Sequence, residues 1–544
     1  MLKLLGQKAT KGLRPPVTSS RKSLTSSSQI IVPSASATST INNLANELGQ
    51  SPQKRRISLK AANSNKWQAG ITPDLETPFE GVPLVAQQQG PLDCDLSDFS
   101  DVMRWPQCKI SGLESGLRVA TENLPWNNNT VSIGVFIDAG SRYETEENNG
   151  SAHFLEHLAF KGTNKRTREQ LEMEVEDLGG HLNAYTSREQ TVYYAQVLQE
   201  NTSDAIDILS DIICNSQLDE QSIERERSVI LQEMENVYSD TKEELIFDHL
   251  HENCFQDCAL GRTILGPVDN IKRINRNDLL EYINTYYTAD NMVIVATGNI
   301  PDHDKFVNEI KDKFSSLNPT NRHKPNKDIS YFRGCEYEER WDDMDYVYMA
   351  LAYETCKWND ADTYPLMFMQ QMLGQWDKKF PGGQYNTSSF TRYLYQDPSR
   401  PIAENYMAFN TPYTDIGLFG VYACVHPYDF KYFYEAARKE MNRFGYDVNE
   451  SQIEDVRERL KATMLLALGN TSQIMEMIGR EILVHGRRIH PTEAFTRVND
   501  VDVNAIKLAA HRHLIDKDYA MAAVGPTHEF PYYTVFRNVH YKAW

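Results

Sequence analysis

Hydrophobic residues in the first half of the chain gather in short stretches whose spacing changes from strand-like to helix-like. Residues 131–139 (VSIGVFIDA) and 292–298 (MVIVATG) are rich in β-branched residues, which favours buried strands. Two further strand-like stretches, 181–185 and 191–197, flank a turn at 187–190. The stretches with helical spacing are 151–162, 168–178, 200–215 and 221–238. This pattern predicts a sheet backed by helices.

The second half repeats this order of elements. Strand-like stretches fall at 346–353, 416–423 and 519–525, and the last of these (YAMAAVG) resembles MVIVATG in the first half. The helix-like stretches are 361–373, 428–444 and 451–468. We therefore expect an α+β fold of two similar α/β-roll domains, each with a mainly antiparallel sheet backed by helices.

The boundary between the two halves is predicted from composition. Residues 315–345 are polar and contain Pro319 and Pro325, which are typical of a connecting segment. We place an N-terminal domain at 108–320, a linker at 321–345 and a C-terminal domain at 346–544.

The amino-terminal segment is basic and rich in hydroxyl side chains. Residues 1–70 hold eleven Lys/Arg and a single acid, Glu47. This composition is typical of a mitochondrial transit peptide, and we assign residues 1–65 to such a peptide and a disordered segment. The alternative is a disordered basic tail without targeting function. Residues 66–107 read as an extension before the first domain, either a docking arm or an inert wrap.

Charge, cysteine content and hydropathy limit the kinds of ligand, the redox state and the membrane topology that the chain can have. The whole chain has 56 Lys/Arg against 75 Asp/Glu, so the part after the basic terminus is strongly acidic. Such a surface repels nucleic acid and favours cationic ligands, although acidity also simply keeps large proteins soluble. The eight cysteines follow no disulfide framework and are expected to be reduced thiols. No apolar run approaches the roughly 20 residues needed to cross a bilayer.

One motif carries metal chemistry. His153 and His157 are four residues apart in a predicted helix, so both imidazoles point from one face at the spacing that tetrahedral zinc accepts. Glu156 lies near the same face and can take a proton from a metal-bound water. The order is HxxEH, the inverse of the commoner HExxH. The sequence therefore predicts a hydrolytic zinc centre.

The third ligand is open on spacing alone. A catalytic zinc needs three protein ligands and a water, and Glu226, Glu233 and Glu235 all lie on a later predicted helix. Each of these acids alone is more simply explained as part of a solvated helix face. The HxxEH motif also arises by chance, but here it lies among apolar residues, where ionisable side chains are costly without a purpose.

Longer stretches resemble a known family. GSRYETEENNGSAHFLEHLAFKGTNKR and GGHLNAYTSREQTVYYAQV are similar to the inverzincin peptidases related to pitrilysin and insulin-degrading enzyme. ERSVILQEMENV and LGRTILGPVDNIKRI are similar to the mitochondrial processing-peptidase branch, and equally to the related core subunits of respiratory complex III. The resemblance covers roughly residues 108–544.

The resemblance implies a role for each residue of the centre. The zinc ligands fall on His153, His157 and Glu233, and the general base falls on Glu156. Glu226 matches an acid that orients a ligating histidine. The domain at 108–320 is then the catalytic one.

The resemblance also implies substrate contacts. Phe160 matches a residue lining the pocket after the scissile bond, and Glu244 and Asp248 match acids that hold the substrate arginine. This chain has one extra residue before the acid pair, which weakens that match. The strand edge that pairs with an extended substrate falls on Asn183, Ala184 and Tyr185.

By resemblance, the chain is a zinc metalloendopeptidase subunit that removes presequences from proteins imported into mitochondria. It would work with an α partner that supplies a glycine-rich substrate loop, at the matrix or the matrix face of the inner membrane. Membership of respiratory complex III, peripheral to the membrane, is a further expectation. The alternatives are a non-catalytic core scaffold of that complex and an independent oligopeptidase.

Overall fold

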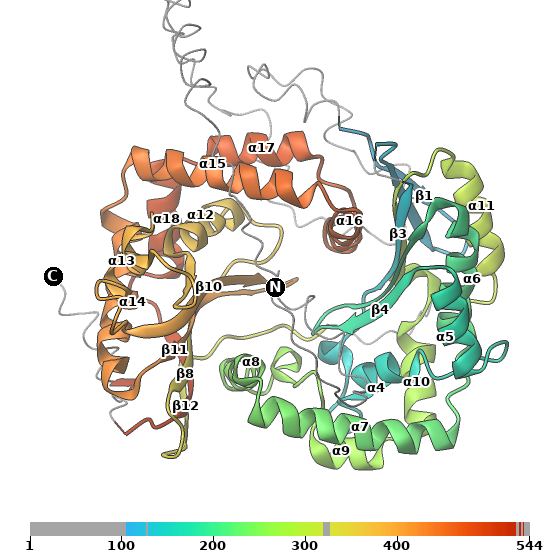
Figure 1. The fold of residues 1–544 in the computed structure, drawn as a ribbon, viewed down its shortest axis with the longest axis horizontal. Helices are drawn as coiled ribbons and strands as arrows, with labels where there is room; N and C mark the ends of the chain where they lie inside the picture. The colour runs from blue at the N-terminus through green and yellow to red at the C-terminus, as the bar shows by residue number, and fades with distance from the viewer. Residues whose placement is uncertain (1–104, 127–128, 319–326, 529–532, 535–536, 538–544) are drawn as a thin grey trace, which may run out of the picture. The chain divides into compact units, whose positions relative to one another are not determined.

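The computed structural model describes residues 105–126, 129–318, 327–528, 533–534 and 537. All of them belong to one unit of the chain, Asn63–Trp544. The predicted transit peptide at 1–65 and nearly all of the predicted extension at 66–107 lie outside the described residues. Two mixed sheets with their helices make up the described part, and the predicted α+β fold is confirmed (Figure 1).

The first sheet has the strand order β1-β2-β6-β3-β5-β4. Only the β2–β6 pair is parallel, so the sheet is mainly antiparallel, as the pattern predicts. The central strands β3 and β6 are almost wholly buried because their Val, Ile and Ala side chains face cover on both sides. The strands are β1 (Lys109–Gly112), β2 (Arg118–Asn123), β3 (Thr130–Ile137), β4 (His181–Thr186), β5 (Thr191–Leu198) and β6 (Met292–Gly298).

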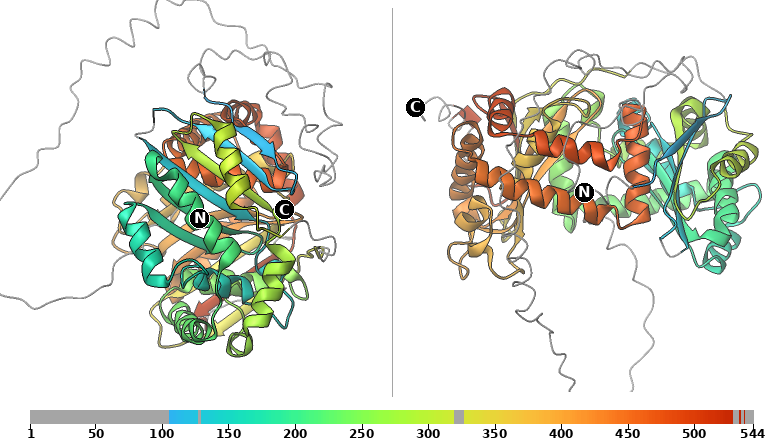
Figure 2. Two further views of the ribbon diagram at one scale, coloured as in Figure 1. Left: turned by 90° about the vertical axis from the view of Figure 1, so that its right-hand side faces the viewer. Right: turned by 90° about the horizontal axis from the view of Figure 1, so that it is seen from above.

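Helices of the first half, apart from α8, cover one face of this sheet, where α6 packs on β5 and β3 and α11 packs on β2 (Figure 2). Their apolar sides join the sheet in one core that includes Ile133, Ile206 and Ile310. The helices are α4 (Ser151–Leu158), α5 (Arg168–Asp177), α6 (Thr202–Asn215), α7 (Glu220–Ser239), α8 (Lys242–Cys254), α9 (Val268–Arg273), α10 (Arg276–Tyr286) and α11 (His303–Lys313).

The second sheet repeats the arrangement in the order β7-β12-β8-β11-β10-β9, with β7–β12 as its parallel pair. Strand β7 lies inside the span 321–345 that composition assigns to the linker. Composition suggested a linker here because β7 is polar, as an edge strand can be. The strands are β7 (Cys335–Arg340), β8 (Val347–Thr355), β9 (Gln375–Asp377), β10 (Ala403–Pro412), β11 (Gly417–Val425) and β12 (Tyr519–Gly525).

The helices of the second half, apart from α16, cover one face of the second sheet. The helices are α12 (Thr363–Leu373), α13 (Ser389–Leu394), α14 (Phe430–Tyr446), α15 (Glu450–Ala467), α16 (Thr471–His485), α17 (Pro491–Asp500) and α18 (Val503–His513). Phe368, Phe433 and Ile506 are buried in the core that these helices share with the sheet.

Two helices cross between the halves. Helix α16 of the second half packs on β3 and β6 of the first sheet, and α8 of the first half packs on β12, β8 and β7 of the second sheet. Ile474, Ile478 and Ile482 of α16 bury apolar side chains against Phe136 and Val293. The span 108–320 thus contains the first sheet, and the span 346–544 contains the second sheet except β7, but each span also contributes a helix to the other sheet.

The contact of α16 with the first sheet is close. Ser132 and Thr471 are joined by their hydroxyl groups at 2.8 Å, and Thr297 donates to the carbonyl of Thr471 at 2.8 Å. A Cβ added at Gly479 in α16 would stand 2.4 Å from the ring of Phe136. A glycine is thus required where the helix meets the aromatic ring.

We predict that Gly479→Ala lowers the free energy of unfolding by about 1–3 kcal/mol, the usual cost of overpacking. Intrinsic helix preference alone would favour the alanine by up to about 1 kcal/mol. Gly445→Ala in α14 is the matched control, since its new Cβ meets the flexible side chain of Ile515 at 3.1 Å. Urea unfolding measures both variants. Equal stability of Gly479→Ala and wild type would contradict the close contact.

Candidate metal centre

Helices α4 and α7 bring the predicted metal ligands together. Phe154 and Leu155 anchor α4 in the first core, and Ile223 and Ile230 anchor α7 in the same core. Asp219 caps α7 by accepting a hydrogen bond from the backbone N–H of Ser222 at 2.9 Å. Burial of these apolar stripes turns the polar faces of the two helices toward each other.

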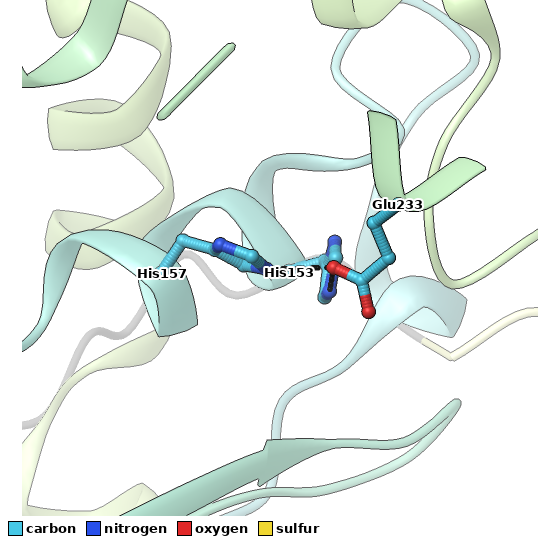
Figure 3. A group of neighbouring side chains, drawn as sticks. All are labelled: His153, His157 and Glu233. Carbon is cyan, nitrogen blue, oxygen red and sulfur yellow. Dashed lines mark hydrogen bonds and ion pairs between the residues drawn. The ribbon is translucent and has the colours of Figure 1, made fainter. Parts of the chain in front are cut away.

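The three side chains of the centre converge (Figure 3). Glu233 Oε2 lies 3.1 Å from His157 Nε2 and 3.7 Å from His153 Nε2. One donor atom from each side chain fits within 4.8 Å of the other two. His153, His157 and Glu233 form the one such group found among the described residues. Glu235 is exposed and outside the group.

Glu226 lies behind His157. Its Oε2 is 3.5 Å from His157 Nδ1, and its Oε1 is 2.9 Å from Lys161 Nζ. Glu226 is buried, whereas Glu156 is half-buried. The two nitrogens of His157 thus face two different acids, with Nδ1 toward Glu226 and Nε2 toward Glu233.

The charges of the centre favour a cation. Burial acts to lower the pKa of His157, but the hydrogen bond that Glu233 accepts from it and the charges of Glu233, Glu156 and Glu226 outweigh burial, so the pKa is raised. The same negative field suits a divalent metal ion. Two imidazoles and one carboxylate are also the donor set of many catalytic zinc sites, so the residues fit such an ion.

A buried acid holds the start of α4. Glu144 accepts hydrogen bonds from the backbone N–H of Ala152 at 2.6 Å and of Gly150 at 2.9 Å, and from the side chain of Asn149 at 2.7 Å. Gly150 has φ +107°, a conformation that favours glycine. The sequence pattern gave no sign of this cap, because Glu144 lies outside the predicted helix.

The predicted substrate strand lies at an edge. Strand β4 pairs only with β5 in the first sheet, and Asn183 is exposed on it. The Tyr185 hydroxyl lies 3.5 Å from Glu476 of α16. Ala184 is buried, and its N–H bonds to the side chain of Asn183 at 2.8 Å. Phe160 is half-buried against the first core, just after α4.

The predicted arginine-binding acids lie on α8. Glu244 and Asp248 are both half-buried, and Asp248 Oδ1 pairs with Arg188 Nη2 at 2.7 Å. Arg188 lies in the turn between β4 and β5, and its side chain is only 9% exposed. The motif matching did not reveal this partner, because Arg188 and Asp248 meet only through the fold.

Family comparisons agree with this geometry. Residues 118–268 match the family described as Insulinase (Peptidase family M16), and residues 273–460 match the Peptidase M16 inactive domain. The chain belongs to peptidase family M16. This membership makes the chain a metallopeptidase and implies a metal ion. The "inactive" description of the second domain agrees with a single metal centre in the first half.

Relatives of this chain within family M16 include subunits of one named peptidase. The chain is 44% identical to a probable mitochondrial-processing peptidase subunit beta of Arabidopsis thaliana, covering 82% of this chain and 83% of the relative. It is 42% identical to the Bos taurus mitochondrial-processing peptidase subunit beta, covering 79% of this chain and 86% of the relative. The predicted family and mitochondrial location are confirmed. The roles of individual residues stay predictions.

Solved structures share the fold. A chain of Candida albicans Complex III2 with bound Inz-5 aligns with a TM-score of 0.70 at 22% identity, covering 79% of this chain and 99% of that chain. A Helicobacter pylori protease aligns with a TM-score of 0.68 at 19% identity, covering 77% and 99%. Among the described residues of the M16 chain, no helix has the length and apolar character of a membrane span.

The cap of α4 gives a pH prediction. Burial raises the pKa of Glu144 to about 7, against the opposing hydrogen bonds from Ala152, Asn149 and Gly150. The folded protein then holds a proton that the unfolded chain has lost, so stability falls as pH rises from about 4.5 to about 7. We expect Glu144→Gln to flatten this part of the stability profile.

Urea unfolding at intervals across that pH range measures the slope. Glu147→Gln, an exposed acid of the same loop, is the control and should keep the wild-type slope. An unchanged slope in Glu144→Gln would show that other groups set the pH dependence.

Proposed function

We propose that this chain is the zinc-bearing catalytic subunit of a peptidase that removes presequences from imported mitochondrial proteins. The observation that carries the proposal is the approach of His153, His157 and Glu233, with Glu156 on the same helix turn. Identity of 40–44% to named processing-peptidase β subunits supports the substrate class. The intact centre favours catalysis over the role of a non-catalytic scaffold.

The proposed metal is zinc, held by His153, His157 and Glu233. Two nitrogen donors and one carboxylate leave a position for water, as catalytic zinc sites require. When bound, zinc would acidify that water and polarise the scissile carbonyl. Glu226 would hold His157 in the tautomer that keeps Nε2 available as a donor atom.

Glu156 is the proposed general base. It follows His153 by three residues on α4, so its carboxylate lies on the flank of the same helix face. Glu156 would take a proton from the attacking water and pass it to the departing peptide nitrogen. Its partial exposure leaves it accessible to both groups.

The proposed substrate path uses three elements. The edge of β4 at Asn183 would pair with an extended peptide, and Phe160 would line the pocket after the scissile bond. Glu244 and Asp248 would bind the substrate arginine by charge-assisted hydrogen bonds. Because Asp248 already pairs with Arg188, it would share its carboxylate between the resident and the incoming guanidinium.

The proposed partner is an α subunit with a glycine-rich substrate loop. Among the described residues of this chain, the glycine pair Gly382-Gly383 lies within a turn too short to serve as such a loop. The acidic chain would recognise basic presequences with this partner's help. Membership of respiratory complex III stays a prediction from sequence.

We predict that Glu156→Gln retains zinc but loses presequence cleavage by at least about 100-fold, the usual contribution of a general base. Glu233→Gln should instead lose the metal. Glu235→Gln on the exposed face of α7 is the control and should behave as wild type. Metal content and cleavage of a presequence peptide are measured on the same samples. Undiminished cleavage by Glu156→Gln would remove the base assignment.

A second prediction concerns the partner. The purified chain alone should bind zinc yet barely cleave a presequence peptide, since the substrate-gripping loop belongs to the α subunit. Adding the α subunit should restore cleavage in proportion to heterodimer formed, followed by size-exclusion chromatography. Full activity of the isolated chain would contradict the proposed division of labour.

A further inference from the structure

Glu226 divides its carboxylate between two neighbours. One oxygen lies 3.5 Å from His157 Nδ1, and the other lies 2.9 Å from Lys161 Nζ. The side chain of Glu226 is only 7% exposed. A carboxylate this deeply buried is stable as an anion only when nearby groups compensate its charge. Lys161 is therefore part of the environment that fixes Glu226.

A tight turn sets the position of Lys161. Helix α4 ends at Leu158, and the backbone N–H of Lys161 donates to the carbonyl of Leu158 at 3.1 Å. The next residue, Gly162, has φ +124°, which favours glycine. Thr163 then anchors the chain through a hydrogen bond from its hydroxyl to buried Asp211 at 2.6 Å. The turn thus delivers the Lys161 side chain to the face of α4 that carries His157.

Neighbouring cations have other partners. Arg168 pairs with Glu172 at 2.8 Å, and Lys165 lies 3.8 Å from Asp207. The Lys165 side chain is 54% exposed, whereas that of Lys161 is 24% exposed. Among the described residues, Lys161 is thus the cation in direct contact with Glu226.

We infer that Lys161 is a positioning residue of the metal centre that acts through Glu226, an inference that rests on the proposed zinc site. Its ammonium group holds one oxygen of Glu226, so that the other oxygen stays directed at His157 Nδ1. This keeps the His157 ring oriented with Nε2 toward Glu233. Without Lys161, the carboxylate of Glu226 turns toward other donors and the imidazole loses its support.

The test compares Lys161→Met and Lys161→Gln with Lys161→Arg, which keeps a cation at the same place. Zinc affinity of the full chain is measured by competition with a chelator of known affinity. We expect Met and Gln to weaken zinc binding about tenfold, the scale found when groups behind a metal ligand are lost. Arg should largely restore binding. Lys165→Met, which also removes one positive charge, should leave the affinity unchanged.

Coupling to Glu226 separates positioning from a general effect of charge. In a Glu226→Gln background, Lys161→Met should weaken zinc binding no further, because its target is already absent. With the α subunit present, Lys161→Met should lower kcat for presequence cleavage while KM stays near wild type. Thermal unfolding of the metal-free proteins should give a lower midpoint for Lys161→Met than for Lys165→Met, because buried Glu226 then lacks its cation, so zinc affinity is measured well below both midpoints.

Three results would overturn the inference. Wild-type zinc affinity in both Lys161→Met and Lys161→Gln would show that Glu226 needs no help. Equal losses with and without Glu226→Gln would show that Lys161 acts elsewhere, and failure of Lys161→Arg to restore binding would indicate a packing role. In each case wild type still binds zinc, so the proposed function stands. If wild type binds no zinc, both fall together.

Discussion

Each sheet of this chain is apolar on both faces, and the helices of its own half cover only one of them. The second face is covered by a helix from the other half: α16 on the first sheet and α8 on the second. The site depends on this reciprocal cover. Helix α8 carries Glu244 and Asp248, and its apolar residues Ile246 and Leu250 pack in the core of the second half. The predicted substrate acids are thus anchored on one sheet and the metal ligands on the other.

The two sheets share five strands in the same order, but each has one extra strand at a different edge, β1 in the first sheet and β9 in the second. Strand β4 ends the first sheet, so its outer edge is available for pairing. The matching strand of the second sheet, β10, is covered along Asn405–Met407 by β9, and the next N–H, that of Ala408, donates to Gly374 at 3.0 Å. Exposed edges invite strand addition, and covering them prevents it. This asymmetry supports the proposed peptide recognition at β4 rather than in the second half.

Local pattern predicted much of this structure, and tertiary contacts account for the rest. The strands β3, β6 and β12 and the helix carrying His153 and His157 were predictable because their periodicity lies within a few residues. The choice among Glu226, Glu233 and Glu235 needed either the resemblance or the packing of α4 on α7. The pair Arg188–Asp248 and the Glu144 cap were not predictable, since each joins segments distant in sequence or lies outside a periodic stretch. Polar β7 was missed because an edge strand needs no apolar alternation.

Buried and half-buried cations pair with several acids of this structure. Lys161 compensates Glu226, Arg188 compensates Asp248, and Arg142 compensates both Glu189, at 2.8 Å, and Asp415. Lys161 and Arg188 each pair with one acid and Arg142 pairs with two, and none of these pairs involves Glu233, which faces the two imidazoles. Pairing an acid with a cation lowers the cost of burying it, while the carboxylate of Glu233 stays directed at His153 and His157. A divalent ion is the ligand that two imidazoles and one carboxylate favour.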